Sequence, residues 1–143
     1  MTLVDANVLL YAYDLRSLHH DRCRTWLEAA FSGPAPVRIA WVTILAFLRI
    51  TTSPRAFPRP FTVSEAESIV SSWLALPTVA PLEPGERYWA ILGKLLVDAQ
   101  VSGPLVMDAA LAALAIEHGA VLCTTDADFR RFPGLRTIDP TSR

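Results

Sequence analysis

The sequence lacks the features that mark secreted, disulfide-stabilised or membrane-spanning proteins. Its 143 residues include only two cysteines, Cys23 and Cys123, which lie far apart and form no Cys-x-x-Cys pair. This pattern favours reduced thiols over a disulfide framework. The chain has no signal-peptide pattern at its start, and no apolar run reaches the ~18 uncharged residues that a membrane-spanning helix needs. We therefore expect a soluble, cytoplasmic protein.

Charged residues are also scarce, at 19% of the chain, whereas 52% of the residues are hydrophobic and the formal net charge is −1. A chain this apolar and this close to neutrality does not remain disordered. The net charge also argues against a protein that is basic over its whole surface and binds nucleic acid in that way. Because the length falls within the ~100–200 residues of a typical domain, we expect residues 1–143 to form a single domain.

The small net charge conceals an uneven distribution along the chain. Residues 1–63 carry a formal charge of +3, residues 64–128 carry −7 and residues 129–143 carry +3. All 13 basic residues except Lys94 are arginine. Arginine suits bidentate contact with phosphate, although a GC-rich coding sequence would produce the same bias.

Short apolar segments alternate with helical segments along the chain. A capping box, Thr62-x-x-Glu65 or Ser64-x-x-Glu67, opens a helix that ends near residue 76. The other expected helices are 6–13, 19–31, 41–51, 86–100, 106–118 and 126–132, and the expected strands are 2–4, 37–40, 78–82, 120–123 and 136–138. The alternation predicts an α/β domain with a mostly parallel sheet and helices on both faces.

Three acidic residues occupy unusual positions for solvated charges. Asp5 and Asp126 each stand between an expected strand and the helix after it, and Asp108 lies in the first turn of the most apolar helix. Because ligands of open α/β sheets bind at the carboxyl ends of the strands, we expect these acids to converge on one edge. Carboxylates that close repel one another unless a cation, a shared proton or an arginine intervenes. Oxygen ligands of this kind suit Mg²⁺ or Mn²⁺.

A structural interpretation competes with the metal site. Asp108 or Asp126, taken singly, is equally well explained as a helix cap. Asp5 has apolar neighbours on both sides and is harder to explain in this way, although a structural ion pair remains the competing explanation.

Four segments resemble, in order and in spacing, those of a known family. They are VDANVLLYA at 4–12, WVTILAFLRITTSPRAF at 41–57, VMDAALAALA at 106–115 and AVLCTTDADF at 120–129. The first, third and fourth are similar to the opening, the acidic helix and the closing Thr-x-Asp-x-Asp-Phe turn of PIN-domain nucleases. The second is similar to the middle helix of the VapC toxins of bacterial type II toxin–antitoxin pairs. The resemblance implies a three-layer PIN-like domain whose mostly parallel sheet has four or five short strands.

The resemblance also implies an activity. VapC toxins are Mg²⁺-dependent endoribonucleases that hydrolyse RNA with metal-activated water, and a cognate VapB-type antitoxin holds them in check. Asp5, Asp108 and Asp126 match three of the four acids usual in this family and would be the catalytic metal ligands, for Mg²⁺ or Mn²⁺. The fourth is commonly a Glu near Ala46, where this chain has none. The departure leaves open whether one or two ions bind. Asp128 is the nearest candidate for a substitute carboxylate, although the interpretation that we favour for it from the sequence is a solvated acid at the start of a helix.

Residues around these acids have candidate supporting roles. Asn7 would hydrogen-bond Asp5 or cap the first helix. Thr124 or Thr125 would orient an acid or bind a phosphate, or would only make ordinary hydrogen bonds at the end of the strand. The candidate RNA contacts are Arg49, Arg55 and Arg130.

The sequence leaves alternatives open for both partner and activity. A buried core explains most of the apolar surplus, and the remainder suggests an interface for a homodimer or for an antitoxin helix. The missing Glu keeps a second hypothesis, that of a catalytically impaired PIN module that acts by binding protein or RNA. A phosphatase-like enzyme with Asp5 as nucleophile is disfavoured, because Asp5-Ala6-Asn7 lacks the second Asp that such enzymes use as an acid.

Overall fold

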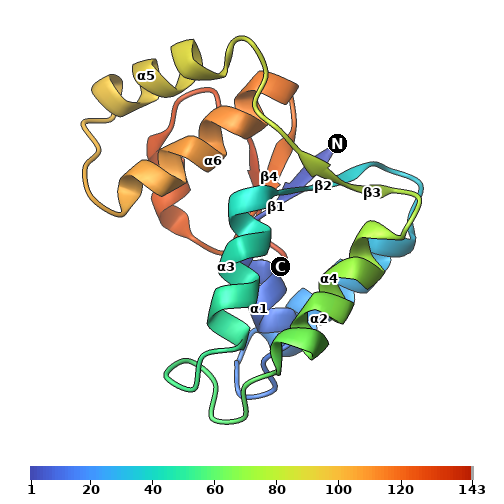
Figure 1. The fold of residues 1–143 in the computed structure, drawn as a ribbon. Helices are drawn as coiled ribbons and strands as arrows, with labels where there is room; N and C mark the ends of the chain where they lie inside the picture. The colour runs from blue at the N-terminus through green and yellow to red at the C-terminus, as the bar shows by residue number, and fades with distance from the viewer. Residues whose placement is uncertain (143) are drawn as a thin grey trace.

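Five parallel strands form the centre of the computed structural model, which describes residues 1–142 (Figure 1). Their order is β3-β2-β1-β4-β5, so the first strand of the chain lies in the middle of the sheet. All four pairings are parallel, which confirms the sheet predicted from the sequence. The strands are β1 (Thr2–Val4), β2 (Val37–Ala40), β3 (Val79–Leu82), β4 (Val121–Cys123) and β5 (Thr137–Ile138).

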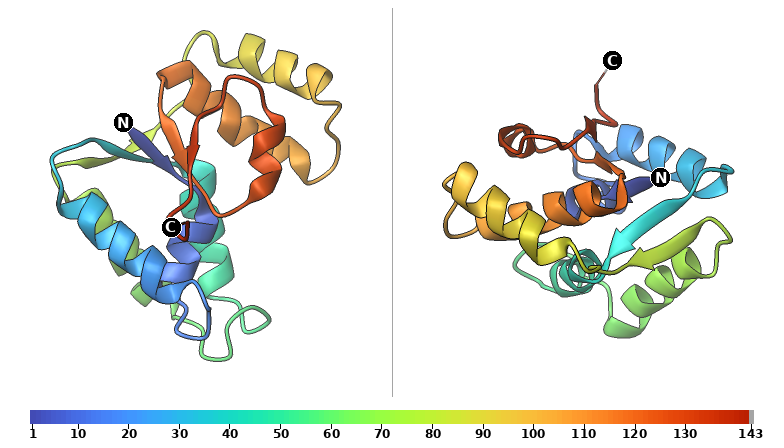
Figure 2. Two further views of the ribbon diagram at one scale, coloured as in Figure 1. Left: turned by 180° about the vertical axis from the view of Figure 1, so that it is seen from behind. Right: turned by 90° about the horizontal axis from the view of Figure 1, so that it is seen from above.

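Helices cover both faces of the sheet, with α5 and α6 together on one side and α2 and α4 on the other (Figure 2). Each helix and strand begins and ends within two residues of its expected position. Among residues 1–142, no helix combines the length and the apolar character that crossing a bilayer requires. The helices are α1 (Ala6–Ala12), α2 (His20–Ser32), α3 (Trp41–Thr51), α4 (Val63–Leu74), α5 (Tyr88–Asp98), α6 (Leu105–His118) and the short 3₁₀ helix η1 (Ala127–Arg131).

The central strands contribute to two separate apolar cores, because successive side chains of a strand point to opposite faces. Leu3 packs into the core beneath α5 and α6, whereas Val4 packs into the core among α1, α2, α3 and α4. Leu122 and Cys123 of β4 divide between the two cores in the same way. A strand covered on both faces needs an apolar residue at every position. The three-layer arrangement therefore explains why β4 is a continuous apolar run and why β1 is apolar at its two buried positions, Leu3 and Val4.

An aromatic cluster fixes α3 against its neighbours. The ring of Phe47, which is fully buried, lies 4.7 Å from the ring of Trp73 and 5.6 Å from that of Tyr13, measured between centroids. The indole N–H of Trp73 donates a hydrogen bond of 3.0 Å to the hydroxyl of Tyr13. Because α3 is held by this face, its other face has a fixed position at the edge of the sheet.

The loop before α5 is tied to the end of α6 by one buried carboxylate. Glu117 accepts hydrogen bonds from the backbone N–H groups of Gly85 (2.7 Å) and Arg87 (2.9 Å), and the Arg87 guanidinium donates to the carbonyl of Glu117 (2.7 Å). These bonds hold residues 85–87 in a turn, so α5 begins at Tyr88 and not at the expected residue 86.

Replacing Phe47 tests the aromatic cluster. We expect Phe47→Ala to lower the free energy of unfolding by ~3–5 kcal/mol, because it removes a fully buried ring and leaves a cavity. Leu45→Ala, on the same helix at a side chain that is 61% exposed, is the matched control and should change the stability by about 0.5 kcal/mol or less. Urea unfolding followed by circular dichroism measures both variants. Equal losses in the two variants would contradict the assignment of Phe47 to the core.

Candidate active site

Asp5 stands where the central strand ends, and its carboxylate is fixed by two hydrogen bonds. It is the N-cap of α1, with one oxygen accepting from the N–H of Ala6 (2.7 Å) and the other from the hydroxyl of Thr124 (2.7 Å). Its own N–H donates to the carbonyl of Cys123 on the adjacent strand (2.9 Å). Burial raises the pKa of Asp5 above its ordinary value, with a smaller contribution from the charge of Asp126, while the two hydrogen bonds act in the opposite direction.

Asp126 has the same structural relation to β4 that Asp5 has to β1. It is the N-cap of η1, and its side chain accepts a hydrogen bond of 2.8 Å from the N–H of Asp128. Its N–H donates to the hydroxyl oxygen of Thr124 (3.1 Å). The Thr124 hydroxyl thus links Asp5 to Asp126. The capping interpretation and the convergence on the sheet edge are both correct for Asp126, because a cap at the end of a strand is held at that edge.

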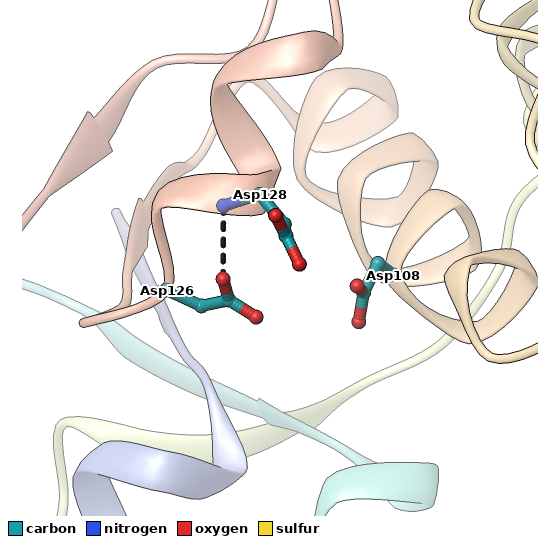
Figure 3. Close-up of side chains that lie close together, drawn as sticks. All are labelled: Asp108, Asp126 and Asp128. Atoms are coloured by element: carbon teal, nitrogen blue, oxygen red, sulfur yellow. Dashed lines mark hydrogen bonds between the residues drawn. The ribbon is translucent and has the colours of Figure 1, made fainter.

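Asp108, from the first turn of α6, completes a group of three facing carboxylates with Asp126 and Asp128 (Figure 3). One oxygen from each of these side chains lies within 4.8 Å of the other two. The side chain of Asp108 is not the cap of its helix. Its position opposite η1 therefore has no role in capping.

The crowding of these acids changes the protonation of Asp108. Its pKa is raised from 3.8 to about 6, first by burial and then by the charges of Asp126, Asp5 and Asp128. Arg131 acts in the opposite direction, and its guanidinium is bound to the carbonyl (3.0 Å) and the carboxylate (3.5 Å) of Asp128. One nearby arginine is insufficient to offset four carboxylates.

A cleft of about 590 Å³ opens beside Asp5 and Asp108, and α3 forms its opposite wall. The α3 residues that line it include Ala46, where the family commonly has Glu, and Arg49. No residue of α3 that lines the cleft is acidic. The apolar residues of the cleft are Ala6, Val42, Leu45, Ala46, Met107 and Leu111.

The chemistry of the donor set fits a hard divalent cation. Every candidate ligand is a carboxylate oxygen, and neither cysteine is accessible, since Cys23 and Cys123 are both fully buried. Such a set suits Mg²⁺ or Mn²⁺. A cation would also relieve the mutual repulsion that raises the pKa of Asp108.

The structure brings together some of the supporting residues and not others. Thr124 contacts Asp5 as expected, whereas within residues 1–142 the side chain of Thr125 makes no hydrogen bond. Asn7 neither bonds Asp5 nor caps α1, because Asp5 itself is the cap and Ala6 supplies the N–H. Of the three candidate RNA contacts, Arg49 alone lines the cleft, while Arg55 lies in the loop after α3 and Arg130 in η1.

The fold and the acidic edge define a protein of the PIN-domain class. The profile of the PIN domain family matches residues 2–135. Ribonuclease VapC37 of Mycobacterium tuberculosis is 44% identical over 140 residues, which are 98% of this chain and 97% of that relative. The chain therefore belongs to the VapC family of PIN-domain ribonucleases.

Solved structures agree on the fold at much lower sequence identity. VapBC2 from Rickettsia felis, bound to a DNA fragment from its promoter, has a TM-score of 0.71 at 17% identity and covers 96% of this chain and 97% of its own. The sarcin-ricin-loop-cleaving toxin VapC20 of Mycobacterium tuberculosis has a TM-score of 0.68 at 14% identity, with 95% and 99% covered. At these identities the likeness extends to the architecture alone.

The raised pKa of Asp108 predicts a dependence of stability on pH. Because this carboxyl holds its proton up to about pH 6 in the folded protein but only to about 3.8 when unfolded, stability should fall as the pH rises from 4 to 7. We expect Asp108→Asn to raise the unfolding free energy at pH 7.5 in EDTA, by about 1 kcal/mol once solvent screening is allowed for. The gain should shrink towards pH 4.5, where the folded wild-type protein already carries the proton. Thermal unfolding at both pH values measures this, and a gain independent of pH would rule out the electrostatic origin.

Proposed function

We propose that this chain is a Mg²⁺-dependent endoribonuclease, the toxin of a VapBC toxin–antitoxin pair. The observation that carries the proposal is the group of three facing carboxylates, Asp108, Asp126 and Asp128, with Asp5 beside Asp108 in the same cleft, in a member of the VapC family. These acids would hold a divalent cation, which when bound would activate a water and neutralise charge during hydrolysis of an RNA phosphodiester. Mn²⁺ would serve in the same way, since both ions take oxygen ligands.

The surroundings of each acid suggest its role in binding the cation. Asp108, Asp126 and Asp128 each present an oxygen to the others and would hold the cation directly. Asp5 would be the central ligand, since it lines the cleft together with Asp108 and two hydrogen bonds fix the orientation of its carboxylate. Thr124 is a positioning residue: its hydroxyl donates to Asp5 and accepts from the N–H of Asp126, so it sets the spacing of two strand ends.

A VapB-type antitoxin is the partner that we propose for the apolar surface at the mouth of the cleft, most of which lines the cleft itself. Four side chains there are at least 45% exposed to solvent: Trp41, Val42, Leu45 and Met107. Apolar side chains gathered in one patch mark an interaction surface. A second copy of the chain, giving a homodimer, is the other occupant that we propose for this surface. Arg55 and Arg130 remain proposed contacts with the RNA backbone outside the cleft.

One observation favours the second candidate function, a PIN module that binds without cutting. The α3 wall of the cleft supplies no carboxylate, so the acids all come from the other side. Cleavage of RNA that depends on a divalent ion decides between the two functions.

The first test is cleavage of a labelled single-stranded RNA. We expect the wild-type protein to cut it with Mg²⁺ and not with EDTA. Asp5→Asn, Asp108→Asn and Asp126→Asn should each reduce the rate by ~100-fold or more, since even groups that only orient metal ligands contribute 10–100-fold. Asp98→Asn is the matched control, because Asp98 lies on α5 and is paired with Lys94. A wild-type protein that binds RNA but never cuts it would support the second candidate instead.

The second test restores a carboxylate to α3. Ala46 lines the cleft opposite Asp5 and Asp108, so Ala46→Glu adds an oxygen ligand to the wall that has none. We expect the affinity for Mn²⁺, measured by titration calorimetry, to rise about tenfold, because the number of charged ligands sets the affinity of such sites. Ala46→Gln has nearly the same size without the charge and should leave the affinity unchanged. Equal effects of the two variants would place residue 46 outside the reach of the ion.

A further inference from the structure

Arg49 is the basic residue among those that line the cleft. It lies in the last turn of α3, three residues after Ala46, and this spacing puts the two side chains on one face of the helix. Asp5 and Asp108 line the same cleft on the other side. The cleft therefore has carboxylates on one wall and a guanidinium on the other.

The guanidinium of Arg49 makes no hydrogen bond and no ion pair with any group in residues 1–142. Other arginines are engaged: Arg131 binds Asp128, Arg16 binds Asp14, and Arg24 binds Glu28. Arg49 shares a cleft with two acids and pairs with neither, so space remains between the two walls. Its five N–H donors are available to a ligand in that space.

The ligand must satisfy both walls of the cleft. A group that meets a cation held by the acids and a guanidinium opposite must itself be an anion with several oxygens. A backbone phosphate of RNA has this form, and the planar guanidinium matches two of its oxygens. Apolar side chains belong to both walls, among them Val42 on α3 and Met107 on α6, and they offer no competing partner to the guanidinium.

We propose that Arg49 binds a backbone phosphate of the RNA strand inside the cleft. The inference rests on the proposed nuclease function and adds to it the residue that holds the substrate from the α3 side. The competing role for Arg49 is structural, because a cation in the last turn of a helix interacts favourably with the helix dipole. That role predicts a small loss of stability and no change in RNA binding.

The test measures the binding of a fluorescent 20-nucleotide single-stranded RNA by anisotropy, with Mg²⁺ present and Asp5→Asn as the background so that the strand stays intact. Adding Arg49→Gln should weaken binding roughly tenfold, as expected for the loss of one charge-assisted contact. The slope of log affinity against log salt should fall by about 0.7, the value for one phosphate of a single strand. Arg49→Lys should lie between the two, because lysine keeps the charge and loses the fork.

Two controls separate the contact from general effects. Arg136→Gln removes the same charge just before β5, at the opposite edge of the sheet from the acids, and should change the affinity less than about twofold. In the otherwise wild-type protein, Arg49→Gln should keep the Mn²⁺ affinity at or above its original level, because it removes a positive charge near the ion. Equal weakening by Arg136→Gln and Arg49→Gln, unchanged RNA binding in Arg49→Gln, or a loss of Mn²⁺ affinity would each overturn the proposal.

The outcome is also separable from that of the nuclease proposal. If the wild-type protein cuts no RNA but Arg49→Gln still weakens binding, the nuclease fails and the Arg49 contact stands. If the wild-type protein cuts RNA and Arg49→Gln binds as tightly as its parent, the nuclease stands and the Arg49 contact fails.

Discussion

The hydrogen bond from Thr124 to Asp5 is the contact on which the geometry of the site depends. It joins residues 119 positions apart, and it exists because β1 and β4 are adjacent parallel strands that end at the same edge. A buried carboxylate is costly unless its oxygens are hydrogen-bonded. The Thr124 hydroxyl and the N–H of Ala6 supply those bonds, and the same hydroxyl accepts from Asp126. The side chain of Thr124 therefore compensates the burial of Asp5 and also fixes the distance between Asp5 and Asp126.

The crowding of these carboxylates does not stabilise the folded protein. Burial and like charges raise the pKa of Asp108, and burial raises that of Asp5, which records a free-energy cost in the absence of a cation. The stability comes from elsewhere, from two apolar cores that meet at the central strands. Functional sites often reduce the stability of the folded protein in this way. A divalent cation would turn the same repulsion into attraction.

The helix α3 gives the cleft its asymmetry. One face of this helix is fixed by the packing of Phe47 against Trp73, and the other presents Ala46 and Arg49 to the acids. The charge blocks of the sequence meet at this point, since Asp108 comes from the acidic middle of the chain and Arg49 from the basic first part. A chain with a net charge of −1 can therefore offer an anionic substrate both a cation site and a guanidinium.

The sequence by itself determined the alternation of strands and helices, because the hydrophobic periodicity and the capping box at Thr62 are local signals. It also identified Asp5, Asp108 and Asp126 as unusual, since each is an acid beside an apolar element. It did not predict the role of Asn7 correctly. We expected Asn7 to hydrogen-bond Asp5 or to cap α1, but Asp5 is itself the cap. The sequence also did not show that Arg49 lines the cleft whereas Arg55 and Arg130 lie outside it. Nor did it show that a carboxylate oxygen of Asp128 lies within 4.8 Å of one of Asp108. Those relations depend on the packing of α3 and α6 against the sheet, and contacts between residues distant in sequence have no local signal.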